Sequence, residues 1–225
     1  MNNIEKFKDI PITYSLMAVS ILLFLISTIS DDLAETIFVI GALHGYSVVV
    51  KGEIYRLVSS TFLHSGGMHI IMNMLSLYIV GKMVERLFSK IAYLSIYFIS
   101  AFFGAFTSIY MHLDGVAVGA SGAIFGLFGA LAGFVFVHKD TMGGQFKAFM
   151  KDFGMILIIN LVIGFVVPSI DVSAHVGGLL AGIVGGFIIA KKPRFIEIYL
   201  GTSLLLLIAF YNYLYSIYAN ILSII

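Results

Sequence analysis

The chain has 225 residues, of which 60% are hydrophobic and 11% are charged, whereas soluble domains have roughly 45–50% and about 25%. The formal net charge of +1 gives no basic field that would indicate a nucleic-acid partner. The absence of cysteine excludes disulfides, thiolate catalysis and cysteine-ligated metal sites. This composition predicts an all-α polytopic membrane protein.

Apolar runs between clusters of charged residues predict seven spanning helices of about 20 residues each. The predicted ranges are 12–30, 67–86, 91–112, 121–138, 150–168, 172–190 and 195–220. Pro11, Pro168 and Pro193 lie at or near the edges of these ranges, where a missing backbone N–H costs least. The first range is longer than the apolar part of a signal peptide, so we expect it to stay in the protein. No linker or convincing internal repeat divides the chain, which predicts a single domain over residues 1–225.

The lysines and arginines predict the orientation. Of 13 such residues, all but Lys51 and Arg56 fall in one set of connections between the predicted helices. The acidic residues divide evenly between the two sets, which is compatible with the positive-inside rule because that rule depends on cations. We therefore expect a protein of the cell membrane with its N-terminus in the cytoplasm and its C-terminus outside.

The connection over residues 31–66 is too long for a tight turn and too apolar for a solvated loop. A connection of this length usually carries structure of its own or has a function. Tyr46 and Tyr55 suit the depth of the membrane interface. We expect this segment to be structured and to lie partly in the interface.

With this orientation, the second, fourth and sixth predicted helices all begin at the outer face. The second brings His69 and Asn73, which share one helix face at a spacing of four residues, and His64 comes just ahead of it. The fourth begins with Ser121, and the sixth carries His175 near its start. Because these side chains lie at similar depth, the pattern predicts one polar cavity open to outside water.

Each of these polar residues also has a purely structural explanation. A single serine in a membrane helix commonly bonds its own helix backbone or aids packing. A histidine inside a span is costlier, and it faces the bundle interior or a water-filled cavity. Convergence of three helices at one depth favours a shared site. A proton relay or transport pathway is an alternative, because histidine and asparagine also line such pathways.

Glycines spaced four residues apart follow Ser121 and His175, and such pairs let helix backbones approach closely. We therefore expect the fourth and sixth helices to pack tightly and to bring the serine hydroxyl within hydrogen-bond reach of the imidazole, as a serine nucleophile requires. The pairs are Gly122 and Gly126, Gly129 and Gly133, Gly178 and Gly182, and Gly182 and Gly186.

Three motifs in this order carry a resemblance: YRLVSSTFLHSGGMHIIMNM (55–74), GASGAIFG (119–126) and AHVGGLLAG (174–182). Together they resemble the rhomboid family of intramembrane serine proteases, over the second to sixth predicted helices and the first outer connection. The extra C-terminal span is similar to the six-plus-one arrangement known in that family. The resemblance implies a six-helix core over about 10–191 and one additional transmembrane helix over about 195–220.

The resemblance also implies roles for individual residues. Ser121 matches the nucleophile and His175 matches the general base. His69 and Asn73 match the side chains that help to hold the oxyanion, together with the backbone N–H of Ser121.

Other matched positions are structural, and two of them depart from the family pattern. Arg56 matches a position that organises the first loop, and Glu85 matches one at the cytoplasmic end of the second helix. Gly178 matches the small residue that lets the sixth helix approach the fourth. Phe125 stands where the family often has tyrosine, which keeps ring stacking on the histidine and removes a phenol hydrogen bond. Tyr55 stands where the family often has tryptophan.

Chemistry supports the same assignment. A serine hydroxyl is a weak nucleophile until a base removes its proton, and the tetrahedral intermediate needs hydrogen-bond donors at its oxyanion. No carboxylate plainly completes a triad, although Asp171, four residues before His175, could orient the ring. His64, His69 and His175 do not form a complete zinc ligand set and no HExxH occurs, so we expect no metal and no cofactor.

The expected function is that of an intramembrane serine endopeptidase with a Ser–His dyad, which cleaves transmembrane segments of other membrane proteins near the outer face. Its partners would be these substrates and the lipid bilayer, and the sequence leaves the oligomeric state open. The alternatives are a non-proteolytic protein that binds membrane clients and a proton-coupled transporter. Possession of both Ser121 and His175 favours the enzyme, and the spans offer a transporter little polar chemistry beyond Asn160.

Overall fold

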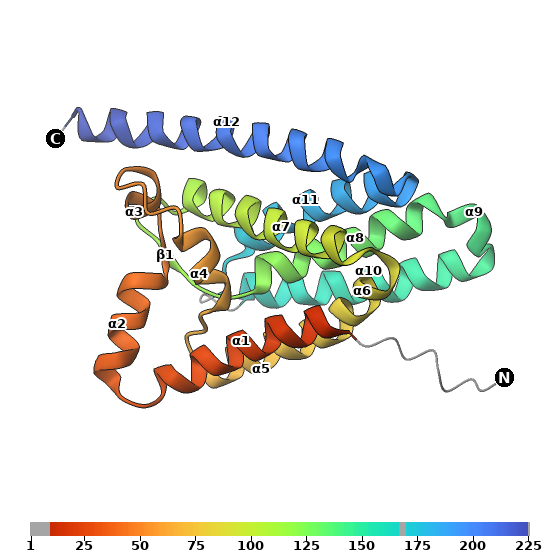
Figure 1. The fold of residues 1–225 in the computed structure, drawn as a ribbon, viewed down its shortest axis with the longest axis horizontal. Helices are drawn as coiled ribbons and strands as arrows, with labels where there is room; N and C mark the ends of the chain where they lie inside the picture. Colours follow the sequence, from red (N-terminus) through yellow and green to blue (C-terminus); the bar gives the residue numbers. More distant parts are fainter. Residues whose placement is uncertain (1–9, 167–169, 225) are drawn as a thin grey trace.

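The computed structural model describes residues 10–166 and 170–224, and nearly all of its regular structure is helical (Figure 1). A long helix lies in each of the seven predicted ranges, so the fold is all-α as predicted. These helices are α1 (Pro11–Ser27), the continuous helix Gly67–Leu87, α7 (Lys90–Met111), α8 (Ser121–Val137), α10 (Gly144–Val166), α11 (Val172–Lys191) and α12 (Ile196–Leu222). Pro168 and the end of the fifth predicted range lie outside the described residues.

Several helices are long and apolar enough to cross a bilayer, which makes this a multi-pass membrane protein. In the described part of the chain, four helical segments meet both conditions: Gly67–Leu87, Lys90–Met111, Val172–Lys191 and Pro193–Leu222. The last joins the short 3-10 turn η2 (Pro193–Phe195) to α12. The helices α1 and α8 are apolar but have 17 residues each.

Two predicted helices differ in detail from the observed ones. The fifth begins at Gly144 rather than at residue 150, after the short α9 (Lys139–Met142) and a turn at Gly143 with φ of 53°. The first turns of α10 are helical but polar, so an apolar run in the sequence does not reveal them. The second consists of α5 (Gly67–Ser76), a five-residue π-helical segment η1 (Leu77–Gly81) and α6 (Lys82–Leu87).

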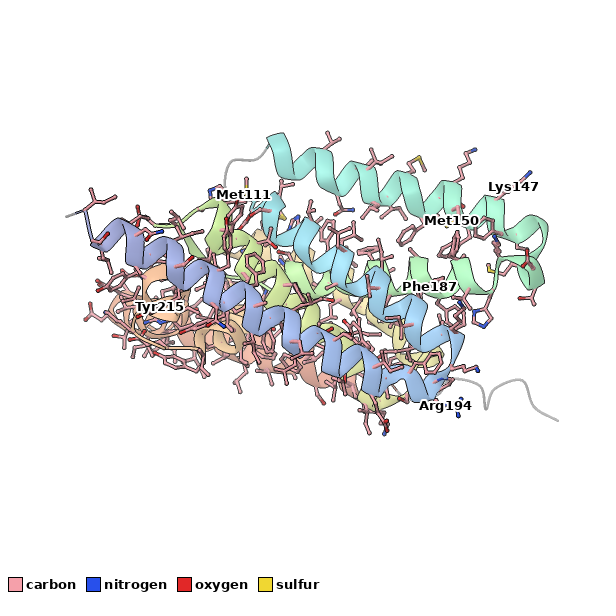
Figure 2. All side chains as sticks on the ribbon, turned by 90° about the horizontal axis from the view of Figure 1, so that it is seen from above. Met111, Lys147, Met150, Phe187, Arg194 and Tyr215 are labelled. Carbon is pink, nitrogen blue, oxygen red and sulfur yellow. The ribbon has the colours of Figure 1, made fainter. Side chains whose placement is uncertain are left out.

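The helices α7, α8 and α11 form the centre of the bundle. Figure 2 shows α11 between α10 and α12 in the view from above. Glycines let α8 and α11 meet backbone to backbone: a Cβ at Gly133 would stand 2.6 Å from the Ile183 carbonyl oxygen, and one at Gly178 would overlap the Gly122 carbonyl group. The predicted close packing of these two helices is therefore confirmed.

The start of α1 is held by a distant carboxylate. Glu85 accepts hydrogen bonds from the backbone N–H groups of Ile12 and Thr13, both at 2.8 Å, and from the Thr13 hydroxyl at 2.6 Å. Pro11, at the first helical position, has no N–H to satisfy. A carboxylate that accepts from first-turn amides caps the helix, so Glu85 fixes α1 against the end of α6.

The connection between α1 and α5 carries its own structure, as predicted. It contains α2 (Asp31–Gly41), β1 (Leu43–His44), α3 (Gly45–Val49) and α4 (Arg56–Phe62). The strand β1 pairs antiparallel with β2 (Val116–Ala117), with Leu43 opposite Ala117. This small sheet joins the first connection to the loop that precedes Ser121. The depth of this segment in the membrane stays a prediction.

Candidate active site

The site begins where the β2 loop enters α8. Ser121 is the first residue of α8, and Gly119 precedes it with a φ of 126°, a conformation that side chains other than glycine rarely adopt. The Gly119 N–H donates to the Ser60 carbonyl oxygen at 2.9 Å. A Cβ at Gly119 would stand 2.9 Å from both Cε1 and Nε2 of His69. The His69 ring therefore lies directly against the chain that leads into Ser121.

His175 is held over the first turns of α8. Its ring stacks on Phe125, with centroids 4.1 Å apart and planes 9° from parallel. Phe125 comes four residues after Ser121, and residues at that spacing share one face of a helix. The stack predicted for Phe125 is thus present, and it places the imidazole on the Ser121 face of α8.

The backbones on which these two residues sit are in contact. A Cβ at Gly122 would stand 3.4 Å from the Ala174 carbonyl oxygen, and one at Gly178 would stand 2.8 Å from the Gly122 carbonyl carbon. The residue after Ser121 therefore touches the residue before His175. Small residues therefore let the two helix backbones approach each other at this crossing.

The imidazole of His175 is buried, and one of its two nitrogens lacks a hydrogen bond within the described part of the chain. The residue is 6% exposed, and its Nδ1 has no hydrogen-bond partner among the residues that the structure describes. Gly164 of α10 faces this nitrogen, since a Cβ there would stand 3.9 Å away. A nitrogen without such a bond can take up or release a proton without first breaking one.

Asn73 and His69 are both close to the site, and Asn73 makes a bond that the sequence does not predict. The Asn73 Nδ2 donates to the His69 carbonyl oxygen at 2.9 Å, one turn back in α5. An amide nitrogen has two hydrogens, so one remains for another acceptor. His69 is half-buried, and its Nδ1 hydrogen-bonds with the Ser65 hydroxyl at 3.2 Å.

Asp171 caps α11 and does not bond the histidine ring. One of its oxygens accepts from the Ala174 N–H at 3.1 Å and from the Ser173 hydroxyl. Burial raises the pKa of this carboxyl, but bonds from Ser108, Ser173 and the Ala174 N–H and the charge of His112 together lower it below its usual value. The carboxylate is therefore charged and fully engaged at the helix start.

His64 lies next to His69 and is buried, with 3% of the residue exposed. Its Nδ1 donates to the Phe62 carbonyl oxygen at 3.2 Å, and its Nε2 has no partner in the described residues. The His64 and His69 rings meet edge to face at 5.2 Å. Burial, with a smaller effect from His69, lowers the pKa of His64 to about 4. No group of three or more metal-ligating side chains is found in the described chain.

Arg56 organises the first connection from a buried position, as the resemblance implies. Its guanidinium donates to the Ala42 carbonyl oxygen at 2.8 Å and to the Glu53 carboxylate at 2.6 Å. Sequence reasoning missed the carbonyl of Ser60 as the partner of Gly119. The glycine two residues before Ser121 was the only signal of that contact, because nothing in the sequence marks a backbone acceptor.

The protein is thus a multi-pass helical membrane protein in which the helices that carry His69, Ser121 and His175 meet at the start of α8. Residues 51–192 match the family model of the Rhomboid domain, and the chain belongs to the rhomboid family.

Known relatives are similar to the chain over about two thirds or more of its length. It is 36% identical over 155 residues to RHOMBOID-like protein 1 of Arabidopsis thaliana, covering 69% of this chain and 39% of that protein. It is 36% identical over 176 residues to Rhomboid protease GluP of Bacillus subtilis, covering 76% of this chain and 33% of that protein. It is 32% identical over 152 residues to Putative rhomboid protease YdcA of the same organism, covering 67% of this chain and 75% of that protein. The chain thus spans less than half the length of the first two relatives.

Proposed function

We propose that this protein is an intramembrane serine endopeptidase that cleaves transmembrane segments of other membrane proteins. Ser121 is the nucleophile and His175 is the general base. Relatives named as rhomboid proteases support the activity, and the matched Rhomboid domain, residues 51–192, contains both residues. The observation that carries the proposal is the contact of α8 with α11 beside Ser121, together with the stack of His175 on Phe125.

The reaction follows from these positions. The Ser121 Oγ attacks the scissile carbonyl carbon while the His175 ring takes the hydroxyl proton, and the same proton then passes to the leaving amine as the peptide C–N bond breaks. A water molecule next attacks the acyl-enzyme, again losing its proton to His175, and releases the carboxyl product with a restored Ser121. No permanently charged group is needed in the spans, where charge is costly.

The oxyanion of each tetrahedral intermediate needs donors aimed at it. The backbone N–H of Ser121 is available because α8 begins there and first-turn amides have no partner within the helix. His69, which lies against Gly119, and the second N–H of Asn73 complete the set. Such a donor is worth roughly 2.7–4 kcal/mol of barrier in other hydrolases.

We further propose that the site opens towards the outer face and that the N-terminus is cytoplasmic. The distribution of lysine and arginine supports this orientation, since only Lys51 and Arg56 lie on the side of the site. Both of these residues belong to the connection between α1 and α5.

The test is cleavage of a generic transmembrane substrate by the purified protein, with the products identified by mass spectrometry. Ser121→Ala should abolish cleavage and labelling by a fluorophosphonate, and His175→Ala should lose nearly as much because nucleophile and base act as one unit. Asn73→Ala should lose up to about 100-fold, since two other donors remain.

Asp171→Ala is the matched control for the dyad. It removes a helix cap, so we expect a stability loss of about 1 kcal/mol with the turnover of the folded protein nearly intact. If Asp171→Ala proved as damaging to turnover as His175→Ala, the site would be a triad. If Ser121→Ala kept full activity, the protease proposal would be wrong and a transporter or client-binding function would replace it.

A further inference from the structure

The helix α12 lies outside the matched domain, yet it bonds to the part of the fold that leads into Ser121. The domain match covers residues 51–192, whereas α12 begins at Ile196. Two of its tyrosine hydroxyls donate to backbone carbonyls of other elements. Tyr211 donates to the Val49 carbonyl oxygen at 3.1 Å, and Tyr218 donates to that of Leu113. Figure 1 shows α12 running alongside α7, with its C-terminal end beyond α3.

These bonds sit in a hydrophobic cluster separate from the core of the bundle. The buried members are Leu43, Val48, Val49, Ala105, Phe106, Ile109, Leu214 and Tyr218. Tyr218 is 4% exposed although most of α12 is exposed. One side of α12 is therefore built to pack on β1, α3 and α7.

Gly45 allows this packing. A Cβ at that position would overlap the Tyr218 hydroxyl oxygen and would stand 2.8 Å from the Leu113 carbonyl oxygen and 3.0 Å from Ile109 Cγ2. Three elements, α3, α12 and the loop after α7, thus meet at one glycine. A methyl group there would push the tyrosine off its acceptor.

The loop over residues 112–120 is held at three points before it reaches Ser121. Tyr218 binds it at Leu113, β1 pairs with it at Val116 and Ala117, and the Ser60 carbonyl accepts from Gly119. The α12 helix supplies the first point directly. Through Tyr211 and Val49 it also supports α3, which follows β1 without a gap.

We propose that α12 is a positioning element for the active site, in which Tyr218 fixes the 112–120 loop and thereby the placement of Ser121 and its backbone N–H. The expected effect on catalysis rests on the proposed protease function. The expected effect on the 112–120 loop rests only on the observed contacts. Tyr218 does not touch the reacting atoms, so it is a positioning residue.

The experiment compares Tyr218→Phe with Tyr215→Phe, which removes a hydroxyl from an exposed tyrosine of the same helix (Figure 2). Amide hydrogen exchange is measured over residues 112–120, and kcat and KM are measured on a transmembrane substrate. Tyr218→Phe should speed exchange in that loop and lower kcat by about 3- to 10-fold with KM unchanged, the effect of one ordinary hydrogen bond. Tyr215→Phe should behave as the unaltered protein. Equal exchange and equal kcat in the two variants would overturn the proposal.

A second comparison uses Gly45→Ala. If its methyl group already displaces the Tyr218 hydroxyl, adding Tyr218→Phe should cost almost nothing more, so the two losses are strongly non-additive. Additive losses would show that the tyrosine acts elsewhere. If the unaltered protein failed to cleave any substrate, the protease function would fall, and the exchange data would still decide whether α12 holds the loop.

Discussion

His64 is a buried histidine whose charged form is disfavoured by burial. Its pKa is lowered from 6.5 to about 4, chiefly by burial. The unfolded chain therefore takes up a proton near pH 6.5, whereas the folded protein does so only near pH 4. The neutral His64 therefore causes no loss of stability above pH 6.5. The free energy of unfolding falls as the pH drops from 6.5 to 4, and the loss is complete below pH 4.

We expect the folded protein in detergent to lose about 2 kcal/mol of stability from this group between pH 7 and pH 5. His64→Asn, whose amide can still donate to the Phe62 carbonyl, should flatten that dependence. Thermal unfolding at several pH values measures the difference. The control is His138→Asn, because His138 also bonds a backbone carbonyl, that of Phe134 at 2.9 Å, from a less buried position. Parallel pH curves for the unaltered protein and His64→Asn would contradict the expectation.

The sequence predicts the residues proposed for the site, but it does not predict the hydrogen bonds that their side chains and those of their neighbours make. Short motifs single out His69, Ser121 and His175 because few polar groups occur near the ends of apolar helices. The bond from Asn73 to the His69 carbonyl and the cap made by Asp171 depend on side-chain rotamers and local backbone geometry. A spacing of four residues puts Asp171 near His175, and only the structure shows that its oxygen turns to the helix start.

At the scale of helices, the crossing of α8 and α11 brings the backbone after Ser121 close to the backbone before His175. Gly178→Val would drive a branched side chain into the Gly122 carbonyl group and separate the two helices. A misplacement of about 1 Å can cost on the order of 100-fold in rate, so we expect a correctly inserted protein with that loss or more.

Turnover per molecule of inserted Gly178→Val, measured against Gly201→Val, tests this expectation. Gly201 lies in α12, and a Cβ there would meet nothing within 4 Å. Normal turnover in Gly178→Val would show that this glycine does not set the separation of Ser121 from His175.

Hydropathy predicts the long helices because membrane spans must bury a continuous apolar surface. It does not predict the strands β1 and β2. Each has two residues, which is too short to show an alternating hydrophobic pattern, and each is a strand because it pairs with the other. Hydropathy also does not predict the π-helical segment Leu77–Gly81, because its apolar residues are equally typical of an α-helix.

For the whole molecule, the proposed orientation in the bilayer predicts which ends of the helices face outwards. The α2 and α3 helices lie at one end of the bundle and α9 at the other, as Figure 1 shows. Cysteines introduced at Asp32 or Asp114 should react from outside the cell with an impermeant thiol reagent, whereas cysteines at Lys139 or Lys192 should not. All four positions are exposed, and the chain has no cysteine to interfere. The opposite labelling pattern would place the site on the cytoplasmic side.

The cap that Glu85 gives to α1 has a consequence for the order of assembly. The backbone N–H groups of Ile12 and Thr13 donate to the carboxylate of Glu85, which is synthesised more than 70 residues later. Until α6 packs beside α1, these two N–H groups lack their carboxylate acceptor. The start of α1 therefore gains its carboxylate partner only after the helix Gly67–Leu87 has been made and has packed beside it.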